Sequence, residues 1–185
     1  MSQYMNLMGK NARKASTEKI NTKIKNKVLK KYISLLDKEK NSIFKANTKD
    51  INFALKKNLK DNLLDRLILN QKKLNDIKNS IKKIIKLKDP VDKILEKWSR
   101  PNGLKIKKVS IPIGVIGIIY ESRPNVTSDV ASLCFKSGNA VILKGGSEAI
   151  NTNKILAKLF RKALKENKVN ENFIQFVNSK DRKMV

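Results

Sequence analysis

The 185-residue sequence predicts an α/β fold in which several helices precede a parallel β-sheet. Apolar residues recur at helical spacing through most of the first hundred positions. Two short apolar runs follow, at 115–120 and 140–143, and helix-length segments separate them from each other and from a third run at 173–177. Strands separated in this way pair in parallel through right-handed crossovers, which is the α/β arrangement.

The N-terminal region is expected to be mostly helical up to about residue 98. Its apolar stripes predict helices at about 17–36, 43–55, 63–68 and 74–85. The last of them stops before Asp89-Pro90, because the residue before a proline disfavours helical backbone. Lysines occupy the outer, solvated faces of these helices.

The next segment changes from helical to strand periodicity. Residues 99–103, SRPNG, are expected to form a turn because they combine proline with Asn-Gly. Leu104, Ile106 and Val109 then alternate with lysines, which indicates a half-exposed strand. The run 115–120 is continuously apolar, which is typical of a strand covered on both faces.

A short helix and a second buried strand are expected next. Val130, Leu133 and Cys134 fall on one side of the helix, and Gly138 ends it. Residues 140–143 form the strand, since they are apolar throughout.

The remaining residues predict a long helix and a third strand. The pair Gly145-Gly146 breaks the chain, and Ser147 is expected to cap a helix whose apolar stripe ends near Ala163. Residues 173–177 form the third strand. Three strands make a thin sheet, and the chain ends where another helix would begin, so we expect these residues to be the front part of a longer protein.

The composition excludes several kinds of site. The chain has no histidine, which removes Ser-His-Asp and Cys-His activation and the commonest transition-metal ligand. Its single cysteine excludes a disulfide framework and a cysteine zinc site, so no metal is expected. No apolar run is long enough to cross a membrane, and the N-terminus lacks the apolar core of a secretory signal, so a cytoplasmic protein is expected.

The net charge of +26 leaves a basic nucleic-acid-binding module as an alternative. The lysines, however, are spread along the helices and form no compact stripe. Aromatic residues make up 5% of the chain and are not interleaved with the basic runs as a base-stacking surface requires. A chain-wide compositional bias explains the charge better, and no specific nucleic-acid partner is expected.

Residues 111–148 differ from their surroundings because three positive side chains there balance three negative ones. In an open parallel sheet, ligands bind beyond the carboxyl ends of the strands, which directs attention to loops 121–127 and 144–148. Lys144, the two glycines after it and the free N–H groups of the following helix would suit a phosphate group. The alternative is an exposed lysine and an ordinary β–α turn, since neither G-x-G-x-x-G nor a P-loop motif occurs.

Three further side chains carry possible chemistry. The Asn125 amide either donates to a developing oxyanion or belongs to a routine turn after proline. Arg123 either binds a carboxylate or phosphate, or pairs with Glu121 or Asp129. Cys134 has no base beside it and shares the helical phase of apolar residues, which favours a buried structural thiol over a nucleophile.

The segment GVIGIIYESRPNVT, followed by ASLCFKSGNAVILKGGSEA, resembles the gamma-glutamyl phosphate reductases, also called glutamate-5-semialdehyde dehydrogenases, of the aldehyde dehydrogenase superfamily. ANTKDINFA, LLDRLIL, KLKDPV and RPNGLKIKKVSIPIG resemble the N-terminal region of the same enzymes in the same order. The resemblance covers essentially the whole chain, whereas such reductases are more than twice as long. It implies an aldehyde dehydrogenase-like fold, with an N-terminal helical region at 1–103 and the first part of a Rossmann-like cofactor-binding domain at 104–185. Another acylating aldehyde dehydrogenase is the alternative, although RPNVT and LLDRL argue against it.

The resemblance implies NADPH-dependent reduction of L-glutamyl 5-phosphate to L-glutamate 5-semialdehyde and phosphate, a step of proline biosynthesis. In these enzymes a cysteine thiolate attacks the acyl phosphate, and hydride from the nicotinamide reduces the resulting thioester. That cysteine lies beyond residue 185 in the family, and Cys134 matches a helix cysteine that is not the nucleophile. The chain alone is therefore expected to be inactive, and the full-length enzyme to be a homo-oligomer.

The resemblance also implies roles for individual residues. Asn125 matches the asparagine that donates to the thioester oxyanion. Lys144 matches the lysine that meets the adenosine ribose or its 2′-phosphate, and Gly145 and Gly146 line the same side of the cofactor. Arg123 is a candidate for binding the charged groups of the substrate.

One departure affects the cofactor site. The wider superfamily often places a ribose-binding glutamate three residues after the lysine, where this chain has Ser147. Glu148 lies one position further on. Both are candidates for cofactor contact, without an assignment between them.

Overall fold

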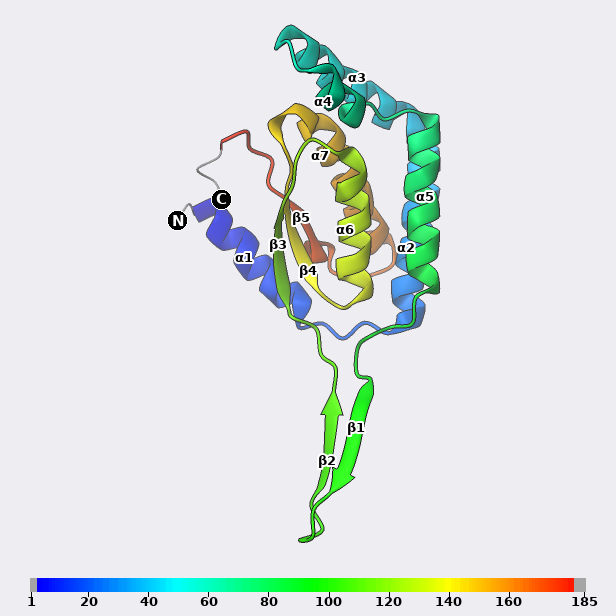
Figure 1. The fold of residues 1–185 in the computed structure, drawn as a ribbon, viewed down its shortest axis with the longest axis vertical. Helices are drawn as coiled ribbons and strands as arrows, with labels where there is room; N and C mark the ends of the chain where they lie inside the picture. Colours follow the sequence, from blue (N-terminus) through cyan, green and yellow to red (C-terminus); the bar gives the residue numbers. More distant parts are fainter. Residues whose placement is uncertain (1–2, 182–185) are drawn as a thin grey trace.

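The computed structural model describes residues 3–181 and consists of a parallel sheet, helices on both of its faces and a separate β-hairpin (Figure 1). The helices are α1 (Gln3–Ser16), α2 (Thr22–Lys38), α3 (Lys40–Lys56), α4 (Asp61–Leu67), α5 (Gln71–Lys86), α6 (Pro124–Lys136) and α7 (Ile150–Glu166), with the 3₁₀ turns η1 (Ser147–Ala149) and η2 (Glu171–Phe173). The strands are β1 (Ile94–Ser99), β2 (Lys105–Val109), β3 (Val115–Ile119), β4 (Ala140–Lys144) and β5 (Ile174–Phe176). The predicted α/β fold is confirmed.

The sheet has the strand order β3-β4-β5, and both neighbouring pairs are parallel. Helix α1 contacts all three strands, and in Figure 1 it lies on the face opposite to α6 and α7. Helices α2 and α5 contact α6, and α2 also contacts α7, so they form an outer layer. The sheet is therefore buried between helices from both ends of the chain, which gives it the layered arrangement of an α/β protein.

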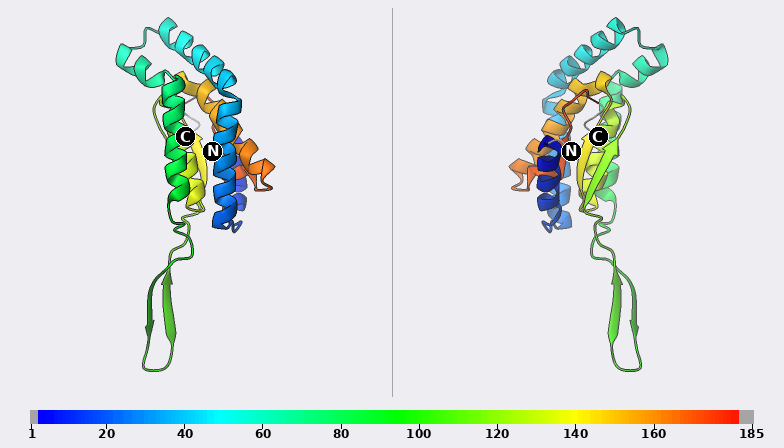
Figure 2. Two further views of the ribbon diagram at one scale, coloured as in Figure 1. Left: turned by 90° about the vertical axis from the view of Figure 1, so that its right-hand side faces the viewer. Right: turned by 90° about the vertical axis from the view of Figure 1, so that its left-hand side faces the viewer.

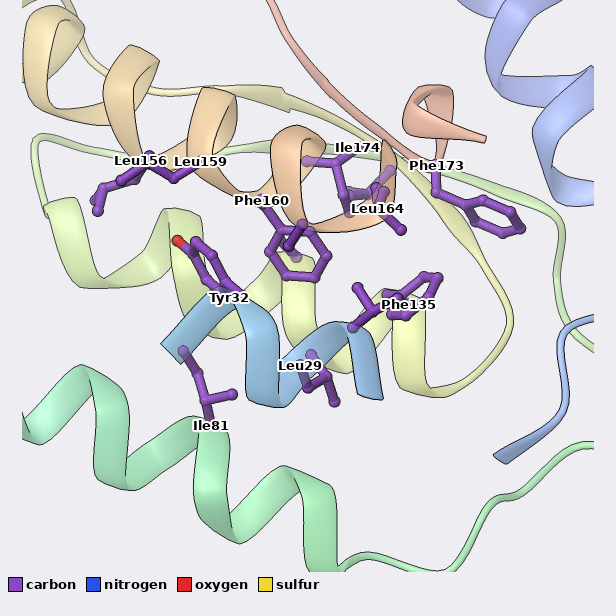
Figure 3. Close-up of a cluster of buried hydrophobic side chains, with 14 of the residues drawn as sticks. Leu29, Tyr32, Ile81, Phe135, Leu156, Leu159, Phe160, Leu164, Phe173 and Ile174 are labelled. Atoms are coloured by element: carbon purple, nitrogen blue, oxygen red, sulfur yellow. The ribbon is translucent and has the colours of Figure 1, made fainter. Parts of the chain in front are cut away.

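The core joins the N-terminal helices to the sheet region (Figure 3). The rings of Tyr32 in α2 and Phe160 in α7 lie 4.5 Å apart between centroids. Phe135 meets Phe160 edge to face at 5.9 Å and Phe173 at 5.5 Å. The buried Tyr32 hydroxyl forms a 2.7 Å hydrogen bond with the Ser128 hydroxyl, and burial raises the pKa of Tyr32 above its ordinary value. One hydrophobic cluster thus includes residues from both regions that the sequence distinguishes.

Two elements of the first hundred residues differ from the prediction. Helix α1 lies in the region expected to be mostly helical but was not assigned as a separate helix, and β1 lies in the stretch predicted to be helical. Strand β1 pairs antiparallel with β2 across the 99–103 turn, and their hairpin projects from the body beside the amino end of β3 (Figures 1 and 2). All six residues of β1 are exposed, so no buried face imposes the period-two alternation that predicts a strand.

Two burial predictions around the sheet were also wrong. Strand β3 lies at the edge of the described sheet and is only partly covered, since its residues are half-buried or exposed and 68% of the surface of Ile119 is exposed. Leu133 is 47% exposed, whereas its neighbour Cys134 is buried as predicted. The predicted 140–143 strand is buried except for Ile142, which is half-buried, and Gly138, with φ at +77°, ends α6 as expected.

None of the helices within residues 3–181 combines the length and the apolar character that a membrane crossing would require.

Candidate functional site

The two loops singled out in the sequence lie side by side at one edge of the sheet. Ile119, the last residue of β3, is paired with Lys144, the last residue of β4. The Tyr120 N–H then donates to the Lys144 carbonyl at 3.1 Å, which extends the pairing into the first loop. The carboxyl ends of two parallel strands are the position at which open α/β sheets bind their ligands.

Asn125 lies in a helix and not in a loop. Helix α6 begins at Pro124, which suits a first helical position because proline has no N–H to leave unsatisfied. Asn125 is therefore the second helical residue, and its side chain is exposed. Its amide donates to Asp129, one turn further along, at 3.3 Å between Nδ2 and Oδ2. The predicted loop 121–127 is shorter than expected.

Lys144 is half-buried where β4 ends, and its ammonium donates to the Ser179 carbonyl of the segment that follows β5. It lines a hollow of about 460 Å³. The same hollow is also lined by Gly145, Gly146, Ser147, Glu148 and Lys180. The structure thus brings together the five predicted cofactor residues and adds a second cation to them.

The two glycines are required by contacts within the protein. A Cβ atom on Gly145 would lie 2.3 Å from Nδ2 of Asn153, and one on Gly146 would lie 2.4 Å from Oγ of Ser122. Real Cβ atoms do not approach other atoms so closely, so a side chain at either position would clash with neighbouring residues of the protein. The absence of side chains therefore lets β3 and α7 pack against the turn, and it does not leave an empty cradle for a ligand.

Ser147 does not cap the long helix, so that prediction was wrong. Its hydroxyl donates to the Glu148 carboxylate at 2.7 Å, and the Ser122 hydroxyl donates to the other carboxylate oxygen at 2.7 Å. Burial opposes ionisation of Glu148, but these two hydrogen bonds, together with a backbone hydrogen bond and the charge of Lys57, outweigh it, and the pKa of Glu148 lies below its ordinary value. A carboxylate is thus held between the two loops.

Helix α7 is capped by Asp50, which belongs to α3. One carboxylate oxygen accepts from the Asn151 N–H at 3.1 Å and from the Asn151 side-chain amide at 2.8 Å. The other oxygen accepts from both the N–H and the hydroxyl of Thr152, each at 2.7 Å. No local sequence signal could have identified this cap, because the capping residue is about a hundred positions away.

A second group that sequence reasoning missed connects β3, α6 and α7. The Thr127 hydroxyl donates to Oδ1 of Asn153 at 2.9 Å, and the Tyr120 hydroxyl forms a 2.7 Å hydrogen bond with the same Thr127 oxygen. Burial raises the pKa of Tyr120 to about 12. These buried contacts fix the end of β3 relative to the start of α6, where Asn125 lies.

Arg123 precedes α6, and its side chain is exposed. Within residues 3–181 it forms no ion pair with Glu121 or Asp129, the two partners considered from the sequence. Glu121 instead meets Arg66 of α4 at 3.5 Å. The guanidinium of Arg123 is therefore available to a ligand.

Three adjoining hollows follow the edge of the sheet. The first, of about 570 Å³, contains Asn125 and lies between α5 and α6, and it shares Arg66 and Arg123 with a second, of about 320 Å³. The second shares Gly146 and Glu148 with the hollow beside Lys144. Asn125 and Lys144 thus stand at the two ends of one row.

Comparison with known proteins shows close relatives along the whole chain. The chain is 46% identical to a gamma-glutamyl phosphate reductase of Persephonella marina over 98% of its own length and 41% of that protein. It is 43% identical to one of Clostridium tetani over 100% of its own length and 44% of that protein. No protein-family model matches the chain.

Solved structures give the same result. The crystal structure of a gamma-glutamyl phosphate reductase from Thermotoga maritima matches with a TM-score of 0.95 at 40% identity, over 97% of this chain and 44% of that one. The Saccharomyces cerevisiae enzyme matches with a TM-score of 0.90 at 33% identity, over 100% of this chain and 48% of that one. A probable aldehyde dehydrogenase from Listeria monocytogenes, at 12% identity and a TM-score of 0.68, shares the fold alone. The predicted aldehyde dehydrogenase-like fold is confirmed, and the chain spans less than half the length of these relatives.

Proposed function

Because the chain is homologous to gamma-glutamyl phosphate reductases along nearly all of its length, we propose that it forms the cofactor-side part of such an enzyme. The reaction is the NADPH-dependent reduction of L-glutamyl 5-phosphate to L-glutamate 5-semialdehyde and phosphate, in proline biosynthesis. The observation that carries the proposal is the row of hollows at the carboxyl edge of the sheet, with an amide donor at one end and an ammonium at the other.

The residues around Lys144 fit the adenosine side of NADPH. Lys144 and Lys180 supply two positive charges, which suit a 2′-phosphate, and Ser147 and Glu148 line the same hollow. The Glu148 carboxylate, held ionised by two hydroxyl groups, suits the hydroxyl groups of a ribose. When bound, NADPH supplies the hydride of the reaction.

Asn125 fits the role of an oxyanion donor. Its amide lies in the first turn of α6, where the helix N-terminus also favours negative charge. Without a substrate, Asp129 accepts the amide hydrogen bond, which orients the side chain along the helix surface. The hydrogen bonds of the Thr127 hydroxyl, with the Tyr120 hydroxyl and with the Asn153 amide oxygen, hold the backbone on which Asn125 lies.

We further propose that these 185 residues alone do not catalyse the reaction. Their single cysteine, Cys134, is 7% exposed, and burial raises the pKa of its thiol to about 11. A thiol of this kind is neither accessible nor ionised at neutral pH, so it cannot attack an acyl phosphate. Oxidation of NADPH by the purified chain in the presence of L-glutamyl 5-phosphate would refute this part of the proposal.

A hybrid enzyme tests the rest. The matching segment of the Thermotoga maritima reductase is replaced by this chain, and NADPH consumption is followed by absorbance. We expect activity, a kcat lowered about 10²- to 10³-fold by Asn125→Ala, and a Kd for NADPH raised about tenfold by Lys144→Ala. Lys30→Ala, at an exposed position of α2, is the matched control and should change neither quantity.

A hybrid that melts like its parent but does not bind NADPH would overturn the proposal. So would an Asn125→Ala hybrid with unchanged kcat. Substrate profiling of the same hybrid tests the alternative of another acylating aldehyde dehydrogenase, which would prefer an acyl substrate without the glutamyl amino and carboxylate groups.

The full-length enzyme is also proposed to be a cytoplasmic homo-oligomer. The β1–β2 hairpin exposes large apolar side chains that self-association would cover, namely Ile94, Leu95, Trp98 and Leu104. Light scattering during size-exclusion chromatography tests the assembly, and a monomeric full-length protein would contradict it.

A further inference from the structure

The first hollow, between α5 and the start of α6, has more charge than an oxyanion donor requires. Arg66, Lys73 and Arg123 bring positive charge to its lining, and Asp76 and Asp129 bring negative charge. These residues come from three helices or their ends, so the fold collects them from distant parts of the sequence. A hollow lined by both signs of charge suits a ligand that carries both signs, such as an amino acid.

Asp129 is the least satisfied of these groups. Its Oδ2 accepts the Asn125 amide at 3.3 Å, while its Oδ1 is buried and has no hydrogen-bond partner among residues 3–181. No lysine or arginine of the described chain forms an ion pair with it. The negative charge of Asp129 is thus not compensated by any cation of the described residues, and a ligand ammonium in the hollow that Asp129 lines would compensate it.

Arg66 and Arg123, which bring positive charge to the same hollow, are available to bind the negative group of a ligand. Arg123 forms no ion pair within residues 3–181. Arg66 meets Glu121 at 3.5 Å, with both side chains largely exposed, so this pair is weak and easily replaced. Two guanidinium groups in one lining can bind a carboxylate through their parallel N–H groups.

Resting on the proposed function, we propose that this hollow selects the amino-acid end of the substrate. Asp129 accepts the α-ammonium, Arg66 and Arg123 donate to the α-carboxylate, and the γ-acyl group lies at Asn125. Asn125 and Asp129 are four residues apart on α6 and their side chains are within hydrogen-bond distance of each other, so a single ligand in the hollow can contact both.

The test is calorimetric titration of the whole chain with three probes that need no cofactor. L-Glutamate has both α-groups, glutarate lacks the ammonium, and 4-aminobutyrate lacks the α-carboxylate. We expect L-glutamate to bind at least about tenfold more tightly than either analogue. Asp129→Asn should remove the advantage over glutarate and Arg123→Gln the advantage over 4-aminobutyrate, each by about tenfold.

Asp65→Asn and Lys107→Gln, at exposed positions outside the hollow, are the matched controls and should leave all three affinities unchanged. Thermal melting confirms that each variant is folded. Any of three results would overturn the inference. The chain binds L-glutamate and glutarate with equal affinity, it does not bind L-glutamate, or Asp129→Asn weakens the binding of all three probes equally. If the chain prefers L-glutamate over both analogues but the hybrid enzyme does not bind NADPH, only the proposed function is refuted.

Discussion

Replacing Asp50 by alanine should destabilise the protein more than any other single carboxylate removal in the described helices. Asp50 is 1% exposed and accepts four hydrogen bonds from Asn151 and Thr152, at distances from 2.7 to 3.1 Å. Thr152 is fully buried, so its N–H and hydroxyl cannot turn to water when the carboxylate is removed. The change therefore leaves the first turn of α7 with unsatisfied donors.

The expected loss follows from two contributions. Loss of a helix N-cap costs about 1 kcal/mol. Loss of hydrogen bonds from buried donors to a charged acceptor costs about 2 kcal/mol more. The sum of about 3 kcal/mol should lower the midpoint of urea unfolding by about 1.5 M, for an m-value of about 2 kcal/mol/M.

The assay is equilibrium urea unfolding of the chain, followed by circular dichroism. Asp65→Ala, at an exposed position of α4, is the control and should change the unfolding free energy by less than about 0.5 kcal/mol. The unfolding free energy of Asp50→Asn should lie between those of Asp50→Ala and Asp65→Ala, because asparagine keeps the side-chain volume but has only one acceptor oxygen. If Asp50→Ala and Asp65→Ala shift the midpoint equally, the long-range cap does not stabilise α7 and the reasoning is wrong.

Three further predictions follow from the described contacts. Gly145→Ala should destabilise the chain by about 1–3 kcal/mol because its Cβ would lie 2.3 Å from a side-chain amide, whereas Gly117→Ala, with no atom within 4 Å, should not change the melting temperature. Cys134, whose pKa burial raises to about 11, should react with an aromatic disulfide reagent at neutral pH only after unfolding, and immediate reaction would contradict its burial. Burial opposes ionisation of Asp89, but hydrogen bonds led by the one from Lys25 keep its pKa below its ordinary value, so its stabilisation is complete above about pH 5 and is lost as the pH falls. Asp89→Asn should make the unfolding free energy fall less steeply between about pH 5 and pH 3, and identical slopes would exclude this role.

The parts of the fold that the sequence predicted are those in which one face is buried. Helices α2, α5 and α7 have apolar stripes because one side of each packs into the core. Strand β4 is apolar throughout because both of its faces are covered. Helix α1 was not assigned as a separate element, because its buried residues are only Met8 and two alanines and include no large branched side chain. Strand β1 was missed because none of its residues is buried. Sequence patterns record burial, so elements with little burial leave little pattern.

The candidate site was predictable to the same extent. Two glycines after a buried strand identified Lys144 and the turn that follows it. The proline before Asn125 identified the loop that follows the other strand. The contacts that hold these residues join segments far apart in the chain, such as Thr127 to Asn153 and Ser122 to Glu148. No local pattern encodes a hydrogen bond between distant segments, so the reason for each glycine and for the helix cap appeared only in three dimensions.

Helix α3 supports both ends of the row of hollows without lining it. Of the described residues that line the three hollows, none belongs to α3. Yet Asp50 of α3 fixes the start of α7, beside the Lys144 end of the row. Asn47, one turn earlier, donates to the Leu67 carbonyl at 2.9 Å and accepts from the Leu69 N–H at 2.8 Å, beside Arg66 at the other end. Because Asn47 also donates to the Thr152 hydroxyl at 3.2 Å, one buried polar cluster sets the distance between the two ends. A change in α3 should therefore affect the cofactor side and the substrate side together, although it touches neither ligand.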